Sequence, residues 1–257
     1  MSNNTVYLIT GANRGIGFSI VKALASDPGN IIFAGARVPA KAIALHDLAK
    51  TSQAKINVVE FVSADTEGNK KAAEEIKKAA GRVDVIIANA GISEPDAFGL
   101  VHESDPAQWT THYNVNVIGV VVLYKEFYSL LHASIVAPKF IVVSSGAGSA
   151  ELAFQFKMPL AVYGASKAAV NYTTVKMHLE SEESGLIVFP LSPGVVSSDM
   201  GNASAKKLFP DGSENALAAM IITPDESAQH IVKLVKEATR ETHGGKHWNY
   251  DGTVLPW

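Results

Sequence analysis

The chain has 257 residues, of which 47% are hydrophobic and 18% are charged, with a formal net charge of −3 and no cysteine. Because the charged fraction lies below the roughly 25% of an average globular protein, a disordered chain is excluded, and the length suits one large α/β domain or two small ones. The absence of cysteine excludes disulfides, thiolate nucleophiles, iron–sulfur clusters and cysteine-ligated zinc.

Neither nucleic acid nor a membrane is indicated as a partner. The 22 basic residues are balanced by 25 acidic ones, and the densest basic stretch, residues 69–78, is interleaved with Glu74 and Glu75 as on a solvated helix face. The longest mostly apolar stretch, residues 115–124, is about half a bilayer span, and the first residues lack the features of a signal peptide. The histidines lack the H-E-x-x-H spacing of a metal site. We therefore expect a cytoplasmic protein without a bound metal.

Short apolar runs alternate with helical patterns along the chain. The runs expected to form strands are residues 6–10, 31–36, 56–63, 83–89, 140–144, 186–192 and 246–250. The segments expected to form helices are residues 15–26, 40–50, 69–80, 106–132, 161–181 and 224–239. The first six runs are almost continuously apolar, as in strands covered on both faces. This alternation, without a linker, predicts one α/β domain over residues 1–257, with a doubly wound parallel sheet of about seven strands flanked by helices.

A glycine-rich segment joins the first predicted strand to the first predicted helix. Residues 10–17 read TGANRGIG, with glycines at positions 11, 15 and 17. Glycines in this place permit a tight turn and let backbone N–H groups approach a pyrophosphate at the helix N-terminus. The segment therefore predicts a dinucleotide site, although such glycines also occur for purely conformational reasons.

The residue after the second predicted strand indicates which dinucleotide is bound. Arg37 stands 20 residues after Gly17, where sites for NAD carry an acidic residue. A guanidinium binds a 2′-phosphate through two hydrogen bonds, whereas a carboxylate repels it. Arg14, inside the glycine segment, offers a second positive group. We predict NADP(H) as the cofactor; the alternative is that Arg37 is a solvated loop residue.

Two tyrosine–lysine pairs have the spacing that places both side chains on one helix face. Tyr163 is followed by Lys167, and Tyr172 by Lys176. Only Tyr163 lies at the start of its helix, near the sheet edge where ligands bind. Reduction of a ketone requires an acid for the developing alkoxide, and a nearby ammonium lowers the pKa of a phenol. We expect Tyr163 to be the general acid and Lys167 to lower its pKa.

Serines and two irregular segments lie at the same predicted edge. Ser144 and Ser145 end the fifth strand and would offer a hydroxyl to a carbonyl oxygen, unless they only form a turn. Residues 146–160 and 194–213 follow strands and are a candidate substrate loop and a candidate lid. The first of them carries the apolar side chains Phe154, Phe156, Met158 and Leu160. We expect a small carbonyl substrate with an apolar portion, although core packing is the commoner role of such residues.

A set of motifs, taken in chain order, resembles the classical short-chain dehydrogenase/reductase family over nearly the whole chain. They are the segment Gly11–Gly17, Asp65, Asn89-Ala90-Gly91, Asn116, Ser145, Tyr163 with Lys167, and Pro193-Gly194. Arg37, the long loop after Ser145 and the ending NYDG…PW are similar to its carbonyl reductase branch, which includes the fungal norsolorinic acid ketoreductases and the Sniffer-type reductases. The resemblance implies a Rossmann-type fold and an enzyme that is often a homodimer or homotetramer.

The resemblance also implies site residues. Tyr163 is the acid/base, Lys167 in addition holds the nicotinamide ribose, Ser145 polarises the carbonyl, and Asn116 supports a water relay to Lys167. Asp65 and the backbone after it bind adenine, and Asn89-Ala90-Gly91 shapes the cofactor pocket. The full set of expected cofactor-binding residues is Gly11, Asn13, Arg14, Gly15, Ile16, Gly17, Arg37, Asp65, Asn89, Ala90, Gly91, Tyr163, Lys167, Pro193, Gly194, Val196 and Ser198.

One spacing departs from the family pattern. Ser145 precedes Tyr163 by 18 residues, more than is usual, so residues 146–160 form an enlarged loop. Ser149 is closer to the common spacing, but Ser145 is better placed at a strand end; Ser144 and Ser149 remain alternatives. The sequence therefore predicts an NADPH-dependent reductase of a ketone or aldehyde. The alternatives are a non-catalytic NADP(H)-binding regulator and an enzyme that oxidises a secondary alcohol.

Overall fold

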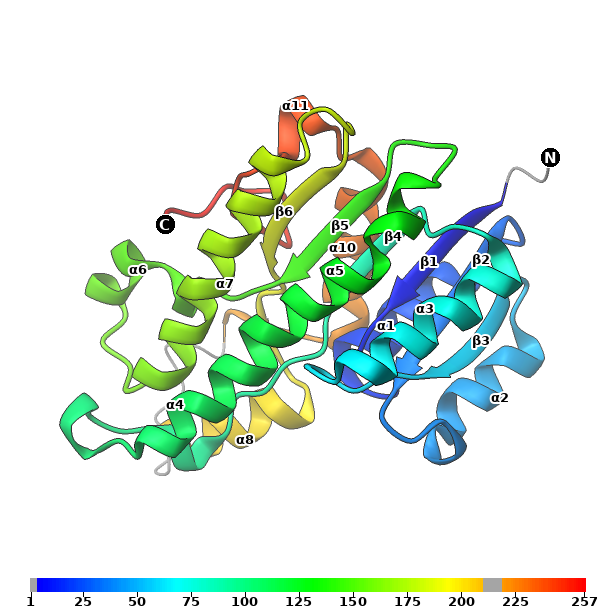
Figure 1. Cartoon of the computed structure of the whole chain (residues 1–257). Coiled ribbons are helices and arrows are strands. Elements are labelled where there is room, and N and C mark those ends of the chain that lie inside the picture. Colours follow the sequence, from blue (N-terminus) through cyan, green and yellow to red (C-terminus); the bar gives the residue numbers. More distant parts are fainter. Residues whose placement is uncertain (1–3, 210–218) are drawn as a thin grey trace.

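The apolar runs form a parallel seven-stranded sheet in the computed structural model, which describes residues 4–209 and 219–257 (Figure 1). The strands are β1 (Thr5–Ile9), β2 (Asn30–Ala36), β3 (Lys55–Glu60), β4 (Val85–Ala88), β5 (Lys139–Val143), β6 (Ile187–Ser192) and β9 (Trp248–Asn249). Their order across the sheet is β3-β2-β1-β4-β5-β6-β9. The predicted doubly wound α/β fold is therefore confirmed.

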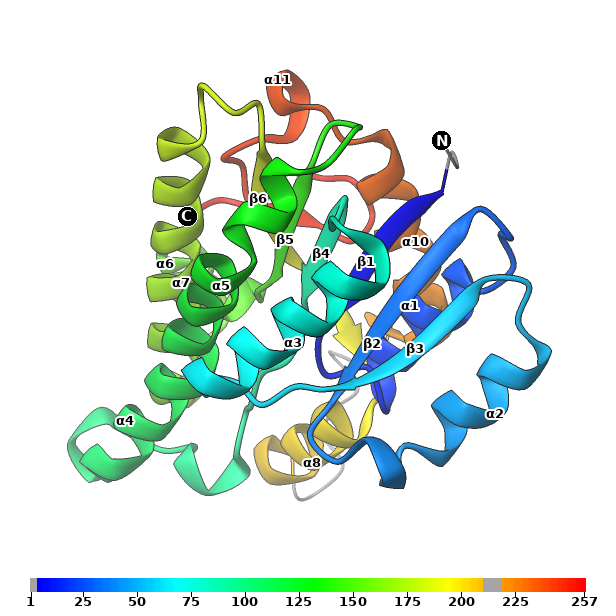
Figure 2. The same cartoon turned by 45° about the vertical axis from the view of Figure 1, so that its right-hand side comes forward.

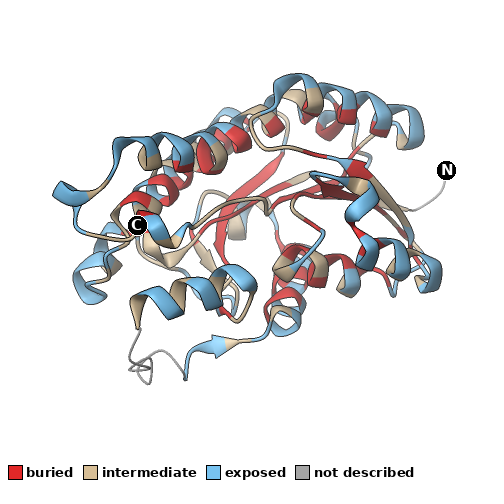
Figure 3. Ribbon diagram, turned by 90° about the horizontal axis from the view of Figure 1, so that it is seen from below, coloured by how far each residue is buried: buried red, intermediate tan, exposed pale blue. Residues whose placement is uncertain are grey.

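Helices cover both faces of the sheet (Figures 1 and 2). They are α1 (Gly15–Leu24), α2 (Ile43–Thr51), α3 (Thr66–Ala80), α4 (Pro106–Tyr113), α5 (Gly119–His132), α6 (Ala150–Gln155), α7 (Ala161–Glu180), α8 (Asp199–Leu208), α10 (Pro224–Glu237) and α11 (Arg240–His243). The alternation of side chains along β1 divides the core in two. Tyr7 and Ile9 pack with α1, α2 and α10, whereas Val6 and Leu8 pack with α3, α5 and α7. Figure 3 shows the buried residues concentrated in the sheet and on the inner helix faces.

The chain reverses its direction across the sheet between β1 and β4. It moves outward from β1 through β2 to β3, then returns to pair β4 with the other side of β1, where Tyr7 lies opposite Val85. In open α/β sheets, such a reversal opens a crevice at the carboxyl ends of the two strands. This crevice is where the glycine segment and Asn89 are found.

The predicted helix over residues 106–132 is interrupted. One π-helical turn, Asn114–Ile118, separates α4 from α5 and contains the buried Asn116. A π turn inserts an extra residue into the helical hydrogen-bond ladder and is frequent at functional sites. Apolar periodicity alone does not reveal this insertion, because α5 continues in the same direction.

By length and composition alone, the helical stretch Pro106–His132 is apolar enough to cross a membrane. Its residues Val120, Leu123 and Phe127 are, however, buried in the core beneath α5. Core helices pass the same composition test, so the stretch is weak evidence for a membrane span.

Other expectations are corrected at the periphery of the fold. β3 is an edge strand in which only Val59 is buried, so the expected burial on both faces is wrong there. The candidate substrate loop 146–160 is not irregular throughout, because it contains α6. The candidate lid 194–213 contains α8 and the strand β7 (Val195–Val196), which pairs with β8 (Ile221–Ile222). Residues 210–213 of that lid lie outside the described residues.

His247, directly before β9, makes the free energy of unfolding depend on pH. Its ring is fully buried, and this burial lowers its pKa to about 4, although a contact with the Pro256 backbone opposes the shift. Between pH 6.5 and pH 4 the unfolded chain therefore binds a proton that the folded chain does not. As the pH falls through this window, we expect His247 alone to remove about 3 kcal/mol from the free energy of unfolding.

The His247→Phe variant tests this expectation by urea denaturation at pH 7 and pH 4. The loss of stability between the two pH values should be smaller in the variant than in the wild type, because the phenyl ring does not titrate. His102→Phe, at an exposed position, is the matched control and should keep the wild-type difference. An unchanged difference in His247→Phe contradicts the expectation.

Candidate active site

The glycine segment curls back on itself between β1 and α1. A Cβ atom at Gly17 would lie 2.3 Å from the carbonyl oxygen of Gly11, and Gly11 has a φ of +62°. A side chain at either position is therefore excluded, by a backbone clash at Gly17 and by backbone strain at Gly11. Together the two residues leave open backbone at the N-terminus of α1, the arrangement that binds a pyrophosphate.

The end of β4 holds this glycine segment in place. The Thr10 hydroxyl accepts hydrogen bonds from the amides of Asn89 and Ala90, each at 3.0 Å. The Asn89 amide group donates to the carbonyl oxygens of Thr10 at 3.0 Å and Gly11 at 3.2 Å. These hydrogen bonds bring together two of the predicted cofactor segments. Thr10 and Asn89 are 79 positions apart in the chain.

The predicted phosphate-binding arginines are both exposed. Arg37 follows β2, and the hydrogen bonds and ion pairs of the described residues include none from its side chain. The Arg14 guanidinium lies 3.4 Å from the Asp199 carboxylate of α8. Ser198, which caps α8, has its Cβ 3.5 Å from where a Cβ of Gly15 would lie. The start of α8 therefore lies against the glycine segment. The predicted residues Asn13 and Ile16 belong to this segment, next to Arg14 and Gly15.

The remaining predicted cofactor residues have clear local roles. Asp65 is exposed and caps α3, accepting the Gly68 amide at 3.0 Å. Gly194 has a φ of +86°, and its Cα is covered by the Tyr250 ring, 2.8 Å from where a Cβ would lie. Val196 is buried in β7 beyond the Pro193-Gly194 turn. Tyr250 was missed as a contact of this turn, because no local pattern links residues so far apart.

Tyr163, Lys167 and Ser145 meet at the carboxyl ends of β5 and β6. Lys167 is buried in the first turns of α7, and its ammonium donates to the Val143 carbonyl at 2.9 Å and lies 5.8 Å from the centre of the Tyr163 ring. Burial lowers the pKa of Lys167 to about 8. Burial also raises the pKa of Tyr163, and a hydrogen bond with the Ser145 hydroxyl opposes that rise. Lys167 thus binds a backbone carbonyl close to the Tyr163 ring, and the expectation that it lowers the pKa of this phenol stays a prediction.

The two alternative serines are engaged elsewhere. Ser144 is buried and donates to the Asn171 side chain at 2.5 Å. Ser149 is buried and caps α6 by accepting the Leu152 amide at 3.1 Å. Ser145 also accepts an amide, that of Ala147 at 3.1 Å, but it is the serine whose hydroxyl acts on the pKa of Tyr163.

Asn116 connects three elements around Lys167. Its amide accepts from the Ile92 amide at 2.8 Å and donates to the Ile92 carbonyl at 3.0 Å and to the Ser166 hydroxyl at 2.9 Å. A Cβ at Gly91 would lie 3.1 Å from the Asn116 side-chain oxygen and 3.6 Å from the Lys167 ammonium. The π turn thus brings Asn116 to the segment after β4 and to α7.

Two glycines allow the Ser145 turn to touch α7 directly. A Cβ at Gly148 would lie 2.7 Å from the Lys167 carbonyl carbon, and one at Gly164 would lie 2.7 Å from the Ala147 carbonyl oxygen. Neither contact was predicted, although Gly148 inside the enlarged loop and Gly164 shortly after it were a signal. The second tyrosine of the expected pairs, Tyr172, is 71% exposed and lies away from this cluster.

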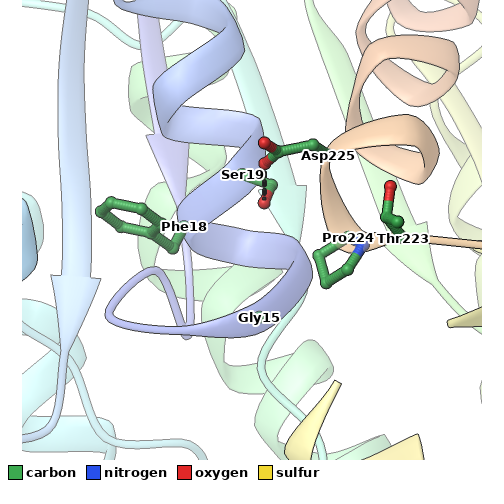
Figure 4. A pocket seen from close by; sticks show the side chains of 6 residues that line it. All are labelled: Gly15, Phe18, Ser19, Thr223, Pro224 and Asp225. Atoms are coloured by element: carbon green, nitrogen blue, oxygen red, sulfur yellow. Dashed lines mark hydrogen bonds between the residues drawn. The ribbon is translucent and has the colours of Figure 1, made fainter. Parts of the chain in front are cut away.

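A hollow of about 430 Å³ borders the glycine segment at Gly15, and neither Tyr163 nor Lys167 lines it. Figure 4 shows that it lies between the starts of α1 and α10. Its residues are Gly15, Phe18, Ser19, Thr223, Pro224 and Asp225. The Asp225 carboxylate accepts hydrogen bonds from Ser19 at 2.6 Å and Lys22 at 2.7 Å, so it ties α10 to α1. Within residues 4–209 and 219–257, no group of three or more His, Asp and Glu side chains is placed to hold a metal.

Comparison with known proteins gives concordant results. A family model described as "short chain dehydrogenase" matches residues 5–208. An uncharacterized oxidoreductase of Schizosaccharomyces pombe is 34% identical over 259 residues, covering 100% of this chain and 99% of that protein. The norsolorinic acid ketoreductase of Dothistroma septosporum is 30% identical and covers 100% and 94%.

Solved structures agree with the sequence relatives. The carbonyl reductase Sniffer of D. melanogaster is similar with a TM-score of 0.85 and 25% identity, over 100% of both chains. An NADPH-bound carbonyl reductase from chicken fatty liver has the same TM-score and identity, over 100% of this chain and 96% of that chain. Both similarities cover the whole of this chain.

Proposed function

The chain belongs to the short-chain dehydrogenase family of oxidoreductases, and from this premise we propose that it is an NADPH-dependent reductase of a ketone or aldehyde. The observation that carries the proposal is that Tyr163 and Lys167 lie together at the sheet edge, with the ammonium 5.8 Å from the centre of the ring, next to Ser145, which lowers the pKa of the phenol. Binding of a dinucleotide alone requires no acid at this position. We further propose that the whole chain is one cofactor-binding domain.

The cofactor site is proposed from groups that fit a phosphorylated dinucleotide. The open backbone at Gly11 and Gly17 suits a pyrophosphate, and the exposed guanidiniums of Arg14 and Arg37 suit a 2′-phosphate. The NADPH-bound relative from chicken supports this choice. Asp65 would contact adenine, and the segments Asn89–Gly91 and 193–198 would complete the site. A reduced nicotinamide bound there supplies a hydride.

Side chains of this site are proposed to deliver the proton to the carbonyl oxygen. Ser145 donates a hydrogen bond to the carbonyl oxygen, and Tyr163 gives that oxygen its phenolic proton. Because burial raises the pKa of Tyr163, the phenol stays protonated at neutral pH. Lys167, charged below a pKa of about 8, stabilises the phenolate once the proton has left. Asn116 would hold a water that returns a proton towards Lys167.

The substrate is proposed to have an apolar portion. Phe154 and Phe156 of the enlarged loop are 86% and 42% exposed, and Met200 of α8 is 39% exposed. These side chains lie on the two segments expected to bound the substrate, where an apolar ligand would cover them. We also propose a cytoplasmic enzyme that assembles as a homodimer or homotetramer.

A panel of ketones and aldehydes with NADPH and with NADH tests the proposal. We expect at least one carbonyl compound to support loss of the reduced-nicotinamide absorbance, with NADPH preferred. Secondary alcohols with NADP⁺ measure the reverse reaction. If NADPH binds but no compound in either direction is turned over, the protein is a cofactor-binding regulator and the proposal is wrong.

The Ser145→Ala variant tests whether Ser145, and not the nearby Ser149, acts on the carbonyl oxygen. We expect kcat for carbonyl reduction to fall by about 10²-fold or more, since a donor to the developing oxyanion is lost. Ser149→Ala is the matched control, because Ser149 caps α6. It should cost about 1 kcal/mol of stability and keep kcat close to the wild type, because a looser α6 affects KM and not the donation to the oxyanion. Equal activity losses in both variants would contradict the assignment.

A further inference from the structure

The enlarged loop, residues 146–160, joins the two residues proposed to contact the carbonyl group. It begins directly after Ser145 and ends three residues before Tyr163. Its helix α6 has no fully buried residue, so the loop contributes little to the core and needs other anchors. What holds this loop therefore affects the distance between the two hydroxyl groups.

The last described segment of the chain folds back towards this loop. After β9 the chain turns, and the Asn249 amide donates to the Thr253 carbonyl at 2.8 Å. The Leu255 amide then donates to the His247 carbonyl at 2.7 Å, and Val254 forms an antiparallel bridge with Trp248. Residues 253–257 therefore run along the outer edge of the sheet.

Trp257 makes the contact with α6. Its carbonyl oxygen accepts the Glu151 amide at 3.0 Å, while Ser149 accepts the next amide, that of Leu152. The first turn of a helix has amides without partners in the helix, so Trp257 completes the capping that Ser149 begins. The indole ring stacks on the buried His247 ring, with centroids 5.6 Å apart and planes 26° apart.

Two further contacts flank this one. A Leu255 methyl group lies 4.0 Å from where a Cβ of Gly146 would be, next to Ser145. At the far end of the loop, the Gly99 amide donates to the Pro159 carbonyl at 3.1 Å. The loop is thus held at both ends, and Trp257 anchors the end near Ser145. Trp257 itself stays 47% exposed, so its other side is not covered by the described chain.

We propose that Trp257 is a positioning residue: stacked on His247, it fixes the enlarged loop between Ser145 and Tyr163 and so sets how the carbonyl substrate fits between them. The inference rests on the proposed reductase function. The residues proposed to bind the dinucleotide follow β1, β2, β4 and β6, whereas the described contacts of Trp257 are with Glu151 and His247. The effect of Trp257 should therefore fall on the substrate and not on the cofactor.

Trp257→Ala tests the proposal. We expect kcat/KM for a carbonyl substrate to fall about tenfold, mainly through a higher KM, because the aromatic stack that orders the loop is lost. The Kd for NADPH should change less than about twofold, as for sites without shared contacts. Trp257→Phe should restore most of the loss. Val254→Ala, whose side chain is exposed in the same segment, is the control and should behave as the wild type.

Limited trypsin digestion gives a second readout that needs no substrate. Lys157 is exposed in the enlarged loop, and we expect faster cleavage after it in Trp257→Ala than in the wild type. Should that variant fail to fold, Trp257→Leu keeps the apolar bulk without the stack and serves in its place.

Three outcomes separate this inference from the proposed function. Unchanged kcat/KM with unchanged cleavage overturns the role of Trp257, as does an equal loss of NADPH affinity, which would mark a general structural defect. If the wild type binds NADPH but reduces no carbonyl compound, the proposed function fails and the substrate role of Trp257 falls with it. Cleavage at Lys157 then still decides whether Trp257 holds the loop.

Discussion

Tyr163→Phe is expected to lose carbonyl reduction by about 10²- to 10⁴-fold while it still binds NADPH. The substitution removes only the phenolic hydroxyl, and the ring that fills the start of α7 remains. Without that hydroxyl, the site loses the acid proposed to protonate the developing alkoxide. The measurement is kcat under saturating NADPH, with the Kd for NADPH followed by fluorescence titration.

Tyr172→Phe is the matched control for this variant. Tyr172 has the same spacing to Lys176 that Tyr163 has to Lys167, but it is 71% exposed on the later part of α7. It should therefore keep wild-type activity. If Tyr163→Phe reduces ketones at the wild-type rate, the proposed role of Tyr163 as general acid is wrong.

Arg37→Asp is expected to weaken NADPH binding by about 10²-fold and to leave NADH binding nearly unchanged. A hydrogen-bonded guanidinium–phosphate contact contributes roughly 1.5–3 kcal/mol, and the new carboxylate adds repulsion of the 2′-phosphate. NADH has a hydroxyl there, which a carboxylate accepts as a partner. The ratio of the two Kd values is the quantity to compare.

Lys55→Asp carries the same change of charge at the amino end of β3, away from the proposed cofactor site. It controls for the general effect of charge and should leave the ratio as in the wild type. An equal loss of NADPH and NADH affinity in Arg37→Asp would show that Arg37 does not distinguish the 2′-phosphate.

Local sequence patterns were enough to predict the fold and the order of the motifs. Strand–helix alternation has a period that a few residues reveal, and the glycines at 11, 15 and 17 lie within one turn. Tyr163 and Lys167 share a helix face by spacing alone, and the exposed Tyr172 confirms that position along the helix separates the two pairs. In each case, the residues that carry the signal are close together in the chain.

Contacts between distant segments were not predictable in this way. The choice of Ser145 over Ser144 and Ser149 depends on Asn171 and on the cap of α6, and the π turn at Asn116 depends on Ile92 and Ser166. Likewise, the sequence placed Lys167 near Tyr163, but its binding to the Val143 carbonyl follows from the packing of α7 on β5.

The sequence by itself therefore determined a Cys-free α/β chain with a glycine-rich dinucleotide segment and a Tyr–Lys pair at the ligand edge of its sheet. Only the tertiary structure decided which serine reaches the phenol and which residues anchor the enlarged loop. The physical reason is that such contacts join residues far apart in the chain, as the hydrogen bond between Glu151 and Trp257 does across about a hundred positions. Their partners are selected by the packing of whole elements, which no local periodicity records.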